Sequence, residues 1–461
     1  MKRRTGTFVV AVGAMLAVAG PAGADIRIDG VATGHTTLAA ALAAAPAGAT
    51  VEVIGGTYRE ALTIIRPVTL LGKPADGAKP LIDGGNAPAA ISIEAEGVVV
   101  DGFAITASGS RALPFGVFSS YSEEACVLVR GAGAVIGNNT VSGCHYGIYM
   151  RAVESGAIEL NRIEKNRFGG IFVLNSRNVG IRENAVAGNG YNGIGVGSVV
   201  FPPAMLKALK PLAGDVRITA EARDLAAVMS ADIEIAGNEV SGHGHGGIVV
   251  AGAARVAVLS NTAHGNGGAP VPRTNPPVTL GSASDIRGYG IGLVCDTRDS
   301  RVADNVARDN DDVGILVDTA YANVVSANEA TGNAVGIGLF GATGNELRAN
   351  TVHDNHDFGI RIERGAAVNQ PPVGNLMVGN DLAGNDVDAY DTSGKDVAPP
   401  AGKGVAKGGP VAAADRAAPN RWNDETAGNR HSGFDETAEG FVDADGDGIG
   451  ELPHPIPGGA A

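Results

Sequence analysis

The stretch Asn161-Arg-Ile-Glu-Lys-Asn166-Arg-Phe-Gly-Gly-Ile171 decides the fold of this chain, because its pattern returns along most of the sequence. An Asn is followed by a small apolar residue, then by a second Asn, and a few positions later by Gly-Ile. The same phrase is found at 184–194, 305–315, 328–337 and 350–360. Self-similarity at a fixed period is the sequence signature of a solenoid.

The spacing of the first Asn predicts a right-handed parallel β-helix. Where no insertion intervenes, successive positions are 22 or 23 residues apart, which fits one coil of three short strands and three turns. Leucine-rich repeats have similar periods but need a repeated Leu frame, which is absent. Asn tolerates the left-handed backbone of a tight turn, and its amide can bond to the Asn one coil away. The predicted ladder comprises Asn139, Asn161, Asn184, Asn238, Asn261, Asn305, Asn328, Asn350 and Asn380.

The amino-acid composition favours one long repeat domain over several globular domains. The chain has 461 residues, 69 Gly and only 4% aromatic residues, as expected for a narrow core of small aliphatic side chains. Its formal net charge is −14, which argues against nucleic acid as a partner.

The N-terminus has the features of a secretory signal. Positive charge at 1–4 precedes an apolar run at 8–19 and a small-residue cleavage site ending at Ala24. The apolar run is short for a membrane span, and no later run approaches spanning length. We therefore expect a periplasmic or secreted protein without stable membrane insertion.

The three cysteines fit an exported protein. Cys126 and Cys144 are close enough in sequence to bridge within one coil, which would leave Cys295 free. None lies in a CxxC motif, so a thiolate metal site is not indicated.

The repeats are interrupted twice and bounded at both ends. A helix at 36–45 is expected to cap the first coil and cover its exposed strand edges. One insertion carries two short amphipathic helices, and the other is a Pro-rich loop. In repeat proteins such insertions often mark the binding face. The predicted organisation is a signal peptide at 1–24, a β-helix at 25–394 with insertions at 198–231 and 267–287, a linker at 395–418, and a tail at 419–461.

The strand after each Gly-Ile carries the candidate catalytic groups. Its two outward columns run from Tyr149 to Arg361 and from Arg151 to Glu363, and most of their members are apolar or Gly. Charge gathers only in the C-terminal half, at Asp296, Asp299, Asp318, Arg361 and Glu363. These residues form either an acid/base groove for a polysaccharide or solvated surface. The apolar strip favours a docking surface for a partner.

Two stretches are candidate metal sites. Asp443, Asp445, Asp447 and Glu451, with a Gly at the bend, present alternate carboxylates of the kind that binds Ca²⁺, against a solvated acidic turn. His243 and His245 are a close pair that we consider as copper ligands. His243 replaces a ladder Asn, so the other interpretation is a histidine that lines a turn.

The two ends of the chain resemble those of NosD-like periplasmic β-helix proteins. The residues that carry this resemblance are 37–42, 49–59, 67–72 and 82–84, the coil repeats, Asn420-Arg-Trp422 and 443–450. The resemblance implies an accessory factor in maturing the copper centre of nitrous oxide reductase, with a periplasmic client or an ABC-transporter complex as partner. The coil repeat alone is similar to that of carbohydrate-active β-helices such as mannuronan epimerases, pectate lyases and glycosidases.

Three hypotheses for function follow. The first is a non-catalytic, NosD-like scaffold that docks a periplasmic partner through the apolar strip and residues 198–231. The second is a carbohydrate-active enzyme that uses the region of Asp296, Asp318 and Glu363. The third is a structural surface protein without activity.

Overall fold

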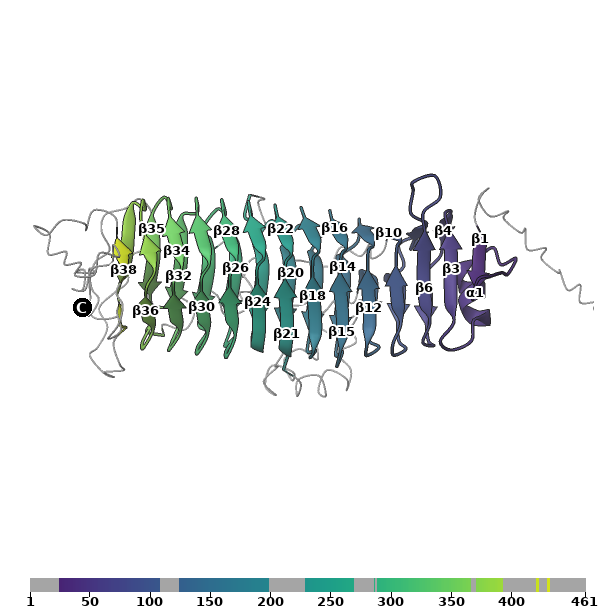
Figure 1. Ribbon diagram of the computed structural model, residues 1–461, viewed down its shortest axis with the longest axis horizontal. Helices are drawn as coiled ribbons and strands as arrows, with labels where there is room; N and C mark the ends of the chain where they lie inside the picture. The colour runs from purple at the N-terminus through teal and green to yellow at the C-terminus, as the bar shows by residue number, and fades with distance from the viewer. Residues whose placement is uncertain are drawn as a thin grey trace, which may run out of the picture.

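The computed structural model describes residues 25–107, 124–198, 229–268, 286, 288–365, 370–392, 420–422 and 429–431. The predicted signal peptide, most of both insertions, the linker at 395–418 and the acidic loop at 443–451 lie outside these residues. The described residues form one long solenoid of three parallel sheets, which confirms the predicted parallel β-helix (Figure 1). Among them, no helix is long and apolar enough to cross a bilayer.

Sheet A has 14 strands and begins with an antiparallel pair that covers its N-terminal edge. From β3 onward its strands are parallel, and each comes from the next coil. In spatial order the strands are β2 (Val31–Ala32), β1 (Asp25–Ile28), β3 (Thr50–Ile54), β6 (Thr69–Lys73), β9 (Val99–Asp101), β12 (Ala134–Gly137), β15 (Gly156–Glu159), β18 (Val179–Arg182), β21 (Ala231–Ala236), β24 (Ala254–Leu259), β27 (Arg301–Ala303), β30 (Val324–Ser326), β33 (Glu346–Arg348) and β36 (Leu376–Val378).

Sheet B has 13 strands, most of them three residues long. The central residue of each three-residue strand points into the core, and its neighbours face outward. The strands are β4 (Thr57–Arg59), β7 (Leu81–Asp83), β10 (Ala104–Thr106), β13 (Thr140–Ser142), β16 (Arg162–Glu164), β19 (Ala185–Ala187), β22 (Glu239–Ser241), β25 (Thr262–His264), β28 (Val306–Arg308), β31 (Glu329–Thr331), β34 (Thr351–His353), β37 (Asp381–Leu382) and β39 (Arg430–His431).

Sheet C has 12 strands and contains the Gly-Ile of each repeat. Most of its strands have five or six residues, so it presents a broad outer face. They are β5 (Leu62–Ile64), β8 (Ala89–Ile93), β11 (Ala125–Val129), β14 (Tyr146–Arg151), β17 (Gly169–Leu174), β20 (Asn192–Gly197), β23 (Gly246–Ala251), β26 (Tyr289–Val294), β29 (Val313–Asp318), β32 (Val335–Phe340), β35 (Phe358–Glu363) and β38 (Val387–Asp391).

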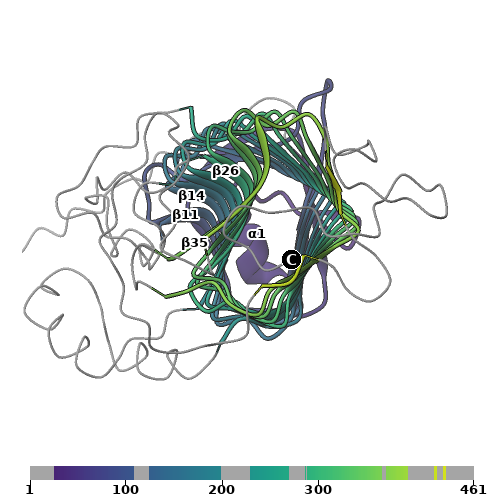
Figure 2. The same ribbon diagram turned by 90° about the vertical axis from the view of Figure 1, so that its left-hand side faces the viewer.

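A short helix closes the N-terminal end of the core, as predicted. Helix α1 (Leu38–Ala44) lies across the first coils when the solenoid is viewed along its axis (Figure 2). The Glu60 carboxylate accepts hydrogen bonds from the backbone N–H groups of Leu38 and Ala39 at 2.7 and 3.0 Å. Arg66 donates to carbonyls at the other end of the helix. Because unpaired groups at both helix ends find partners on neighbouring coils, this short helix is held in place.

The predicted Asn ladder runs along the corner between sheets A and B. Asn328 is typical: its Oδ1 accepts from the backbone N–H and the Nδ2 of Asn305 at 3.0 and 2.9 Å. Its own Nδ2 donates to the Val302 carbonyl and to Asn350 Oδ1, both at 2.9 Å. Each Asn therefore links adjacent coils, and the ladder continues past Asn380 to Asn429.

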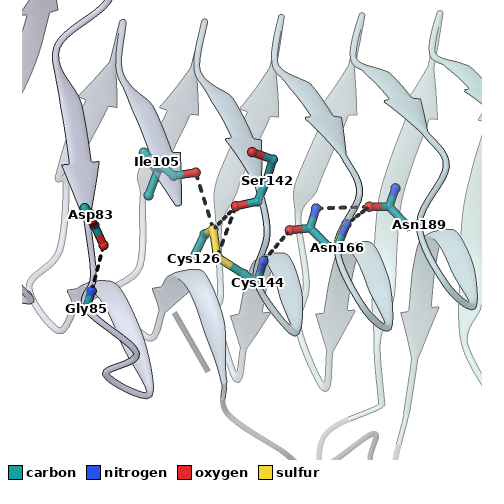
Figure 3. The surroundings of a disulfide bond; sticks show 8 residues. All are labelled: Asp83, Gly85, Ile105, Cys126, Ser142, Cys144, Asn166 and Asn189. Carbon is teal, nitrogen blue, oxygen red and sulfur yellow. Dashed lines mark hydrogen bonds between the residues drawn. A yellow bond between two sulfur atoms is a disulfide. The ribbon is translucent and has the colours of Figure 1, made fainter. Parts of the chain in front are cut away.

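A second ladder occupies the corner between sheets B and C, and two of its positions are not Asn. Cys144 stands at its N-terminal end, where its N–H donates to Asn166 Oδ1 (Figure 3). Cys144 is bonded to Cys126, with the two Cα atoms 5.5 Å apart, so the predicted pair is bridged, although the bond joins β11 to the next coil and does not lie within one coil. His243 fills the other position and accepts the Asn189 N–H through Nδ1 at 3.1 Å.

A third ladder, between sheets C and A, was not predicted. Asn323, Asn345, Asn375 and Asn420 are joined by the same amide bonds, at 3.0 Å in each step. Its last member belongs to the Asn420-Arg-Trp422 motif.

The Trp422 side chain closes the C-terminal end of the core. It is 5% exposed and packs with the core residues. Its Nε1–H donates to the buried carboxylate of Asp391 at 3.2 Å, as does Asn420 Nδ2. We predicted the end of the β-helix at residue 394, whereas residues 420–422 and β39 pair with its last strands. The β-helix thus extends into the predicted tail.

Candidate functional site

The outer face of sheet C carries the predicted columns in the predicted register. Strand pairing places one set of outward residues in line along the solenoid and a second set two residues further along each strand. The first column is Tyr149, Phe172, Gly195, Val249, Gly292, Leu316, Gly338, Arg361 and Tyr390. The second is Arg151, Leu174, Gly197, Ala251, Val294, Asp318, Phe340 and Glu363.

Most of this outer face is apolar and buried, which separates it from ordinary solvated sheet surface. Two clusters lie on it, distinct from the core. The first comprises Ala89, Ala125, Leu128, Tyr146, Tyr149, Phe168 and Leu174. The second comprises Val249, Tyr289, Val294, Val313, Leu316, Val335 and Phe340.

An aromatic stack runs along one edge of this face. Phe168 stacks on His145 and on Tyr191, with ring centroids 5.4 and 4.8 Å apart. Tyr191 stacks on His245 at 4.5 Å, and His245 meets Tyr289 edge to face at 5.1 Å. Because these rings cover one another's faces, the stack stabilises the coils and leaves few ring faces for a ligand.

At several glycines of the first column, an aromatic ring packs against the strand backbone. A Cβ at Gly195 would lie 2.7 Å from the Phe172 ring, and one at Gly338 would lie 2.6 Å from the Phe340 ring. The Tyr289 ring lies over Gly292 in the same way. Glycine is needed at these positions because an aromatic ring lies flat on the strand.

The predicted carboxylates Asp318 and Asp296 lie near Tyr289 and Cys295. Asp318 is 0% exposed and stands between Val294 and Phe340 in its column. Asp296 is in the turn after β26, with φ +62°. Burial, together with the charges of Asp318 and Asp296, raises the pKa of the Cys295 thiol to about 12. Cys295 forms no disulfide, as predicted, and at neutral pH it is a protonated thiol.

The predicted pair Arg361 and Glu363 form a partly exposed charged group at the C-terminal end of the face. Arg361 Nη2 donates to Glu363 Oε2 at 2.9 Å, and the two side chains are 21% and 22% exposed. The guanidinium carbon also lies 5.7 Å from the centre of the Phe340 ring and 5.2 Å from that of Phe358. Ring faces attract a guanidinium, so Arg361 is held from three sides.

Tyr390 is next to Arg361 on the following strand and was not among the predicted residues. It is 1% exposed, and its ring lies 5.5 Å from that of Phe358. Burial raises the pKa of its hydroxyl, the Glu363 charge adds to this effect, and Arg361 opposes it. The phenol therefore stays protonated at neutral pH and can donate a proton or a hydrogen bond.

The structure separates the predicted carboxylates. Asp318 pairs with Phe340, and Phe340 pairs with Glu363, so two strand spacings of about 4.8 Å lie between their backbones. Backbones about 10 Å apart, with a Phe between them, do not favour the close carboxylate pair of a retaining glycosidase. Arg361, Glu363 and Tyr390 are the residues that the fold brings together.

The two metal hypotheses have different outcomes. Both ring nitrogens of His243 are engaged, Nδ1 with the Asn189 N–H and Nε2 with the Val186 carbonyl at 3.1 Å. His245 stacks between Tyr191 and Tyr289. In the described part of the chain, no group of three or more His, Cys, Asp and Glu residues can hold a metal ion, so these residues do not fit copper. The predicted calcium ligands Asp443, Asp445, Asp447 and Glu451 lie outside the described residues.

Comparison with known proteins identifies the fold. The family description "right handed beta helix region" matches residues 118–200 and 217–394, more than half of the chain. A comparison with curated protein sequences found no match.

Three solved structures illustrate the similarity. The A-module of mannuronan C-5 epimerase AlgE6 from Azotobacter vinelandii has a TM-score of 0.50 at 14% identity, covering 86% of this chain and 88% of that module. The periplasmic alginate epimerase AlgG has a TM-score of 0.46 at 14% identity, with 75% and 84% covered. An exopolygalacturonase from Thermotoga maritima has a TM-score of 0.48 at 12% identity, with 67% and 80% covered. At these identities the shared property is the fold.

Proposed function

This chain belongs to the right-handed β-helix family, and we propose that it is a polysaccharide-active protein whose site is the C-terminal end of the outer face of sheet C. One observation carries the proposal: the paired Arg361 and Glu363 of β35 lie beside Tyr390 of β38, next to the rings of Phe340 and Phe358. A few convergent polar groups among aromatic side chains are typical of a ligand site.

The chemistry of these groups fits acid–base work on a sugar. Glu363 supplies a carboxylate that can take up a proton, and Tyr390 supplies a protonated phenol that can donate one. Arg361 holds Glu363 in place and is the positive charge of the site. The name of the similar mannuronan C-5 epimerase points to polysaccharides as the first substrates to test.

The test is turnover of defined polymers by the purified mature protein. We would incubate it with polygalacturonate, alginate and a neutral glucan, and follow reducing ends, unsaturated products and sugar epimers by NMR. We expect Glu363→Gln to lower turnover at least 100-fold. The matched control is Glu164→Gln, which alters a similar in-strand Arg–Glu pair on sheet B. If none of the polymers is bound or changed, or if E363Q is as active as the wild type, the proposal fails.

The NosD-like accessory role is a second proposal, supported by the resemblance of the two chain ends, including Asn420-Arg-Trp422, to NosD-like proteins. In this role the protein would be exported, would bind a periplasmic client or an ABC-transporter complex, and would need no catalytic carboxylate. The buried Cys126–Cys144 bridge favours an oxidising compartment for either proposal. Capture of the same client by wild-type protein and E363Q, with no polymer turnover by either, would support the accessory role.

A further inference from the structure

Two buried hydrogen-bond donors of the proposed site have no partner. Among the described residues, the hydroxyl of Tyr390 and the Nε–H of Arg361 are both inaccessible and unbonded. A buried polar group left in this way costs about 1–3 kcal/mol. Most such groups in native proteins are bonded, so each exception needs a physical reason. A bound ligand that supplies the acceptor is one such reason.

The two donors are neighbours on the same face. Arg361 pairs in register with Tyr390, and both point outward, since Ile360, Ile362 and Ala389 beside them belong to the core. Adjacent strands are about 4.8 Å apart, so one ligand can contact both side chains. Arg361 is not free to swing away, because Glu363 and two Phe rings hold its guanidinium.

The missing partner has the chemistry of an anion with two acceptor oxygens. The unpaired Arg361 Nε–H can only donate, and the buried Tyr390 phenol brings its own proton. A planar guanidinium matches the geometry of a carboxylate and binds it more strongly than a neutral acceptor. A sugar hydroxyl would bring a further proton that itself needs an acceptor.

We propose that Arg361 and Tyr390 form a carboxylate-binding site, and that the ligand is an acidic sugar unit of the polymer. This inference rests on the proposed function and narrows it to uronate-containing polysaccharides. Glu363 keeps its bond to Arg361 Nη2 and lies close to the bound anion. Its negative charge therefore weakens binding while it supplies the base for turnover.

The experiment compares polymers that differ only in the carboxylate. Binding of polygalacturonate and of its fully methyl-esterified form would be measured by titration calorimetry, with alginate as a second acidic polymer and free galacturonate as a small carboxylate. We expect the acidic polymers to bind wild type at least 10-fold more tightly than the ester. Arg361→Gln should weaken acidic binding about 100-fold and Tyr390→Phe about 10-fold. Glu363→Gln should tighten it, although it loses turnover.

Two control variants separate site effects from folding effects. Arg162→Gln removes an arginine that bonds Glu164 within its strand on sheet B, at a site without flanking rings. Tyr58→Phe removes the other tyrosine hydroxyl that is buried and unbonded in the described residues, at the N-terminal end of the core. Both controls should bind acidic polymers like wild type. Tyr390→Phe should melt no earlier than wild type, because it removes an unpaired buried hydroxyl.

The outcomes distinguish the two proposals. Equal binding of acid and ester polymers, both weakened by R361Q, would overturn the carboxylate inference and leave the polysaccharide function standing. Binding of free galacturonate alone, without any polymer, would support the anion site and overturn the polymer function. If acidic polymers bind and R361Q and Y390F bind them like wild type, the assignment of these residues is wrong. If neither polymer nor galacturonate binds, both proposals fail.

Discussion

At the scale of single residues, the ladder positions show how one side chain can make the solenoid sensitive to acid. His243 takes the place of an Asn, and its Nδ1 must stay unprotonated to accept the Asn189 N–H. Burial lowers the pKa of His243 to about 4 from 6.5, against the opposing effect of its bonds to Val186 and Asn189. Folding therefore favours the neutral imidazole.

The prediction for His243 concerns stability between pH 6.5 and 4. In this window the unfolded chain binds the proton and the folded chain does not, so stability falls as the pH falls. A His243 pKa lowered from 6.5 to about 4 corresponds to about 3 kcal/mol. Urea unfolding at pH 7.5 and 4.5 should show that His243→Asn, which restores a ladder Asn, removes a loss of about this size. The exposed His356→Asn should not, and equal losses in wild type and H243N would contradict the prediction.

The residues show why sequence reasoning found two ladders and missed the third. The first two ladders each contribute one Asn to the repeated motif, as Asn161 and Asn166 do, so the two sequence signals support each other. The third has Asn-x-apolar at 323–325, 345–347, 375–377 and 420–422, but earlier coils carry Ser176, Ser230 or Ser300 in the same column, so the Asn pattern is short. The spacing of 22 residues between Asn323 and Asn345 was a usable signal. The third ladder gives Asn420-Arg-Trp422 a structural role that the family resemblance alone did not reveal.

At the scale of strands and coils, the Cys126–Cys144 bridge joins β11 to the turn after β13, where the second ladder begins. The backbone N–H of Cys144 donates to the Asn166 side chain, so the ladder begins at a residue that a disulfide holds in place. No Asn is needed at this position, because the bridge ties the coil to its neighbour.

We expect the double variant Cys126→Ser/Cys144→Ser to be less stable in this region. The bridge closes a loop with a sequence separation of 18, for which chain entropy predicts about 3 kcal/mol. Hydrogen exchange should show faster opening of β11 and β14, with little change in β32 and β35, since coils contact only their neighbours. Cys295→Ser is the control. Unchanged exchange in β11 and β14 would show that the ladder bonds suffice without the bridge.

The candidate site was predicted only in part, for reasons that lie in the strands. The alternation of inward and outward side chains along a strand predicted that Arg361, Glu363 and Asp318 lie on the outer face, because the Gly-Ile phrase sets the register. It did not predict that Asp318 is buried, because burial depends on rings such as Phe340 from adjacent coils. Tyr390 was missed because β38 has no Gly-Ile and carries Ala389 at the core position.

At the scale of the whole molecule, the solenoid is stable only if both ends of its core are covered. Helix α1 covers the first coil and Trp422 covers the last. Along the inward column Val325, Leu347, Met377 and Trp422, the largest side chain is the last one. The proposed site lies on the final coils, so its geometry depends on this second closure.

The final prediction is that Trp422 controls both local stability and the proposed site. Trp422→Ala removes about 3–5 kcal/mol of core packing and takes the indole N–H from the buried Asp391 carboxylate. Hydrogen exchange should show loss of protection in β36 and β38 and normal protection from β3 to β12, as expected when stability is a sum of neighbour contacts. Because Tyr390 is on β38, polymer binding should fall with that protection. Trp422→Phe keeps a ring but not the donor and should give an intermediate loss. Uniform loss of protection along the solenoid would show that it unfolds as one unit, and unchanged protection in β38 would show that the core end is closed by other residues.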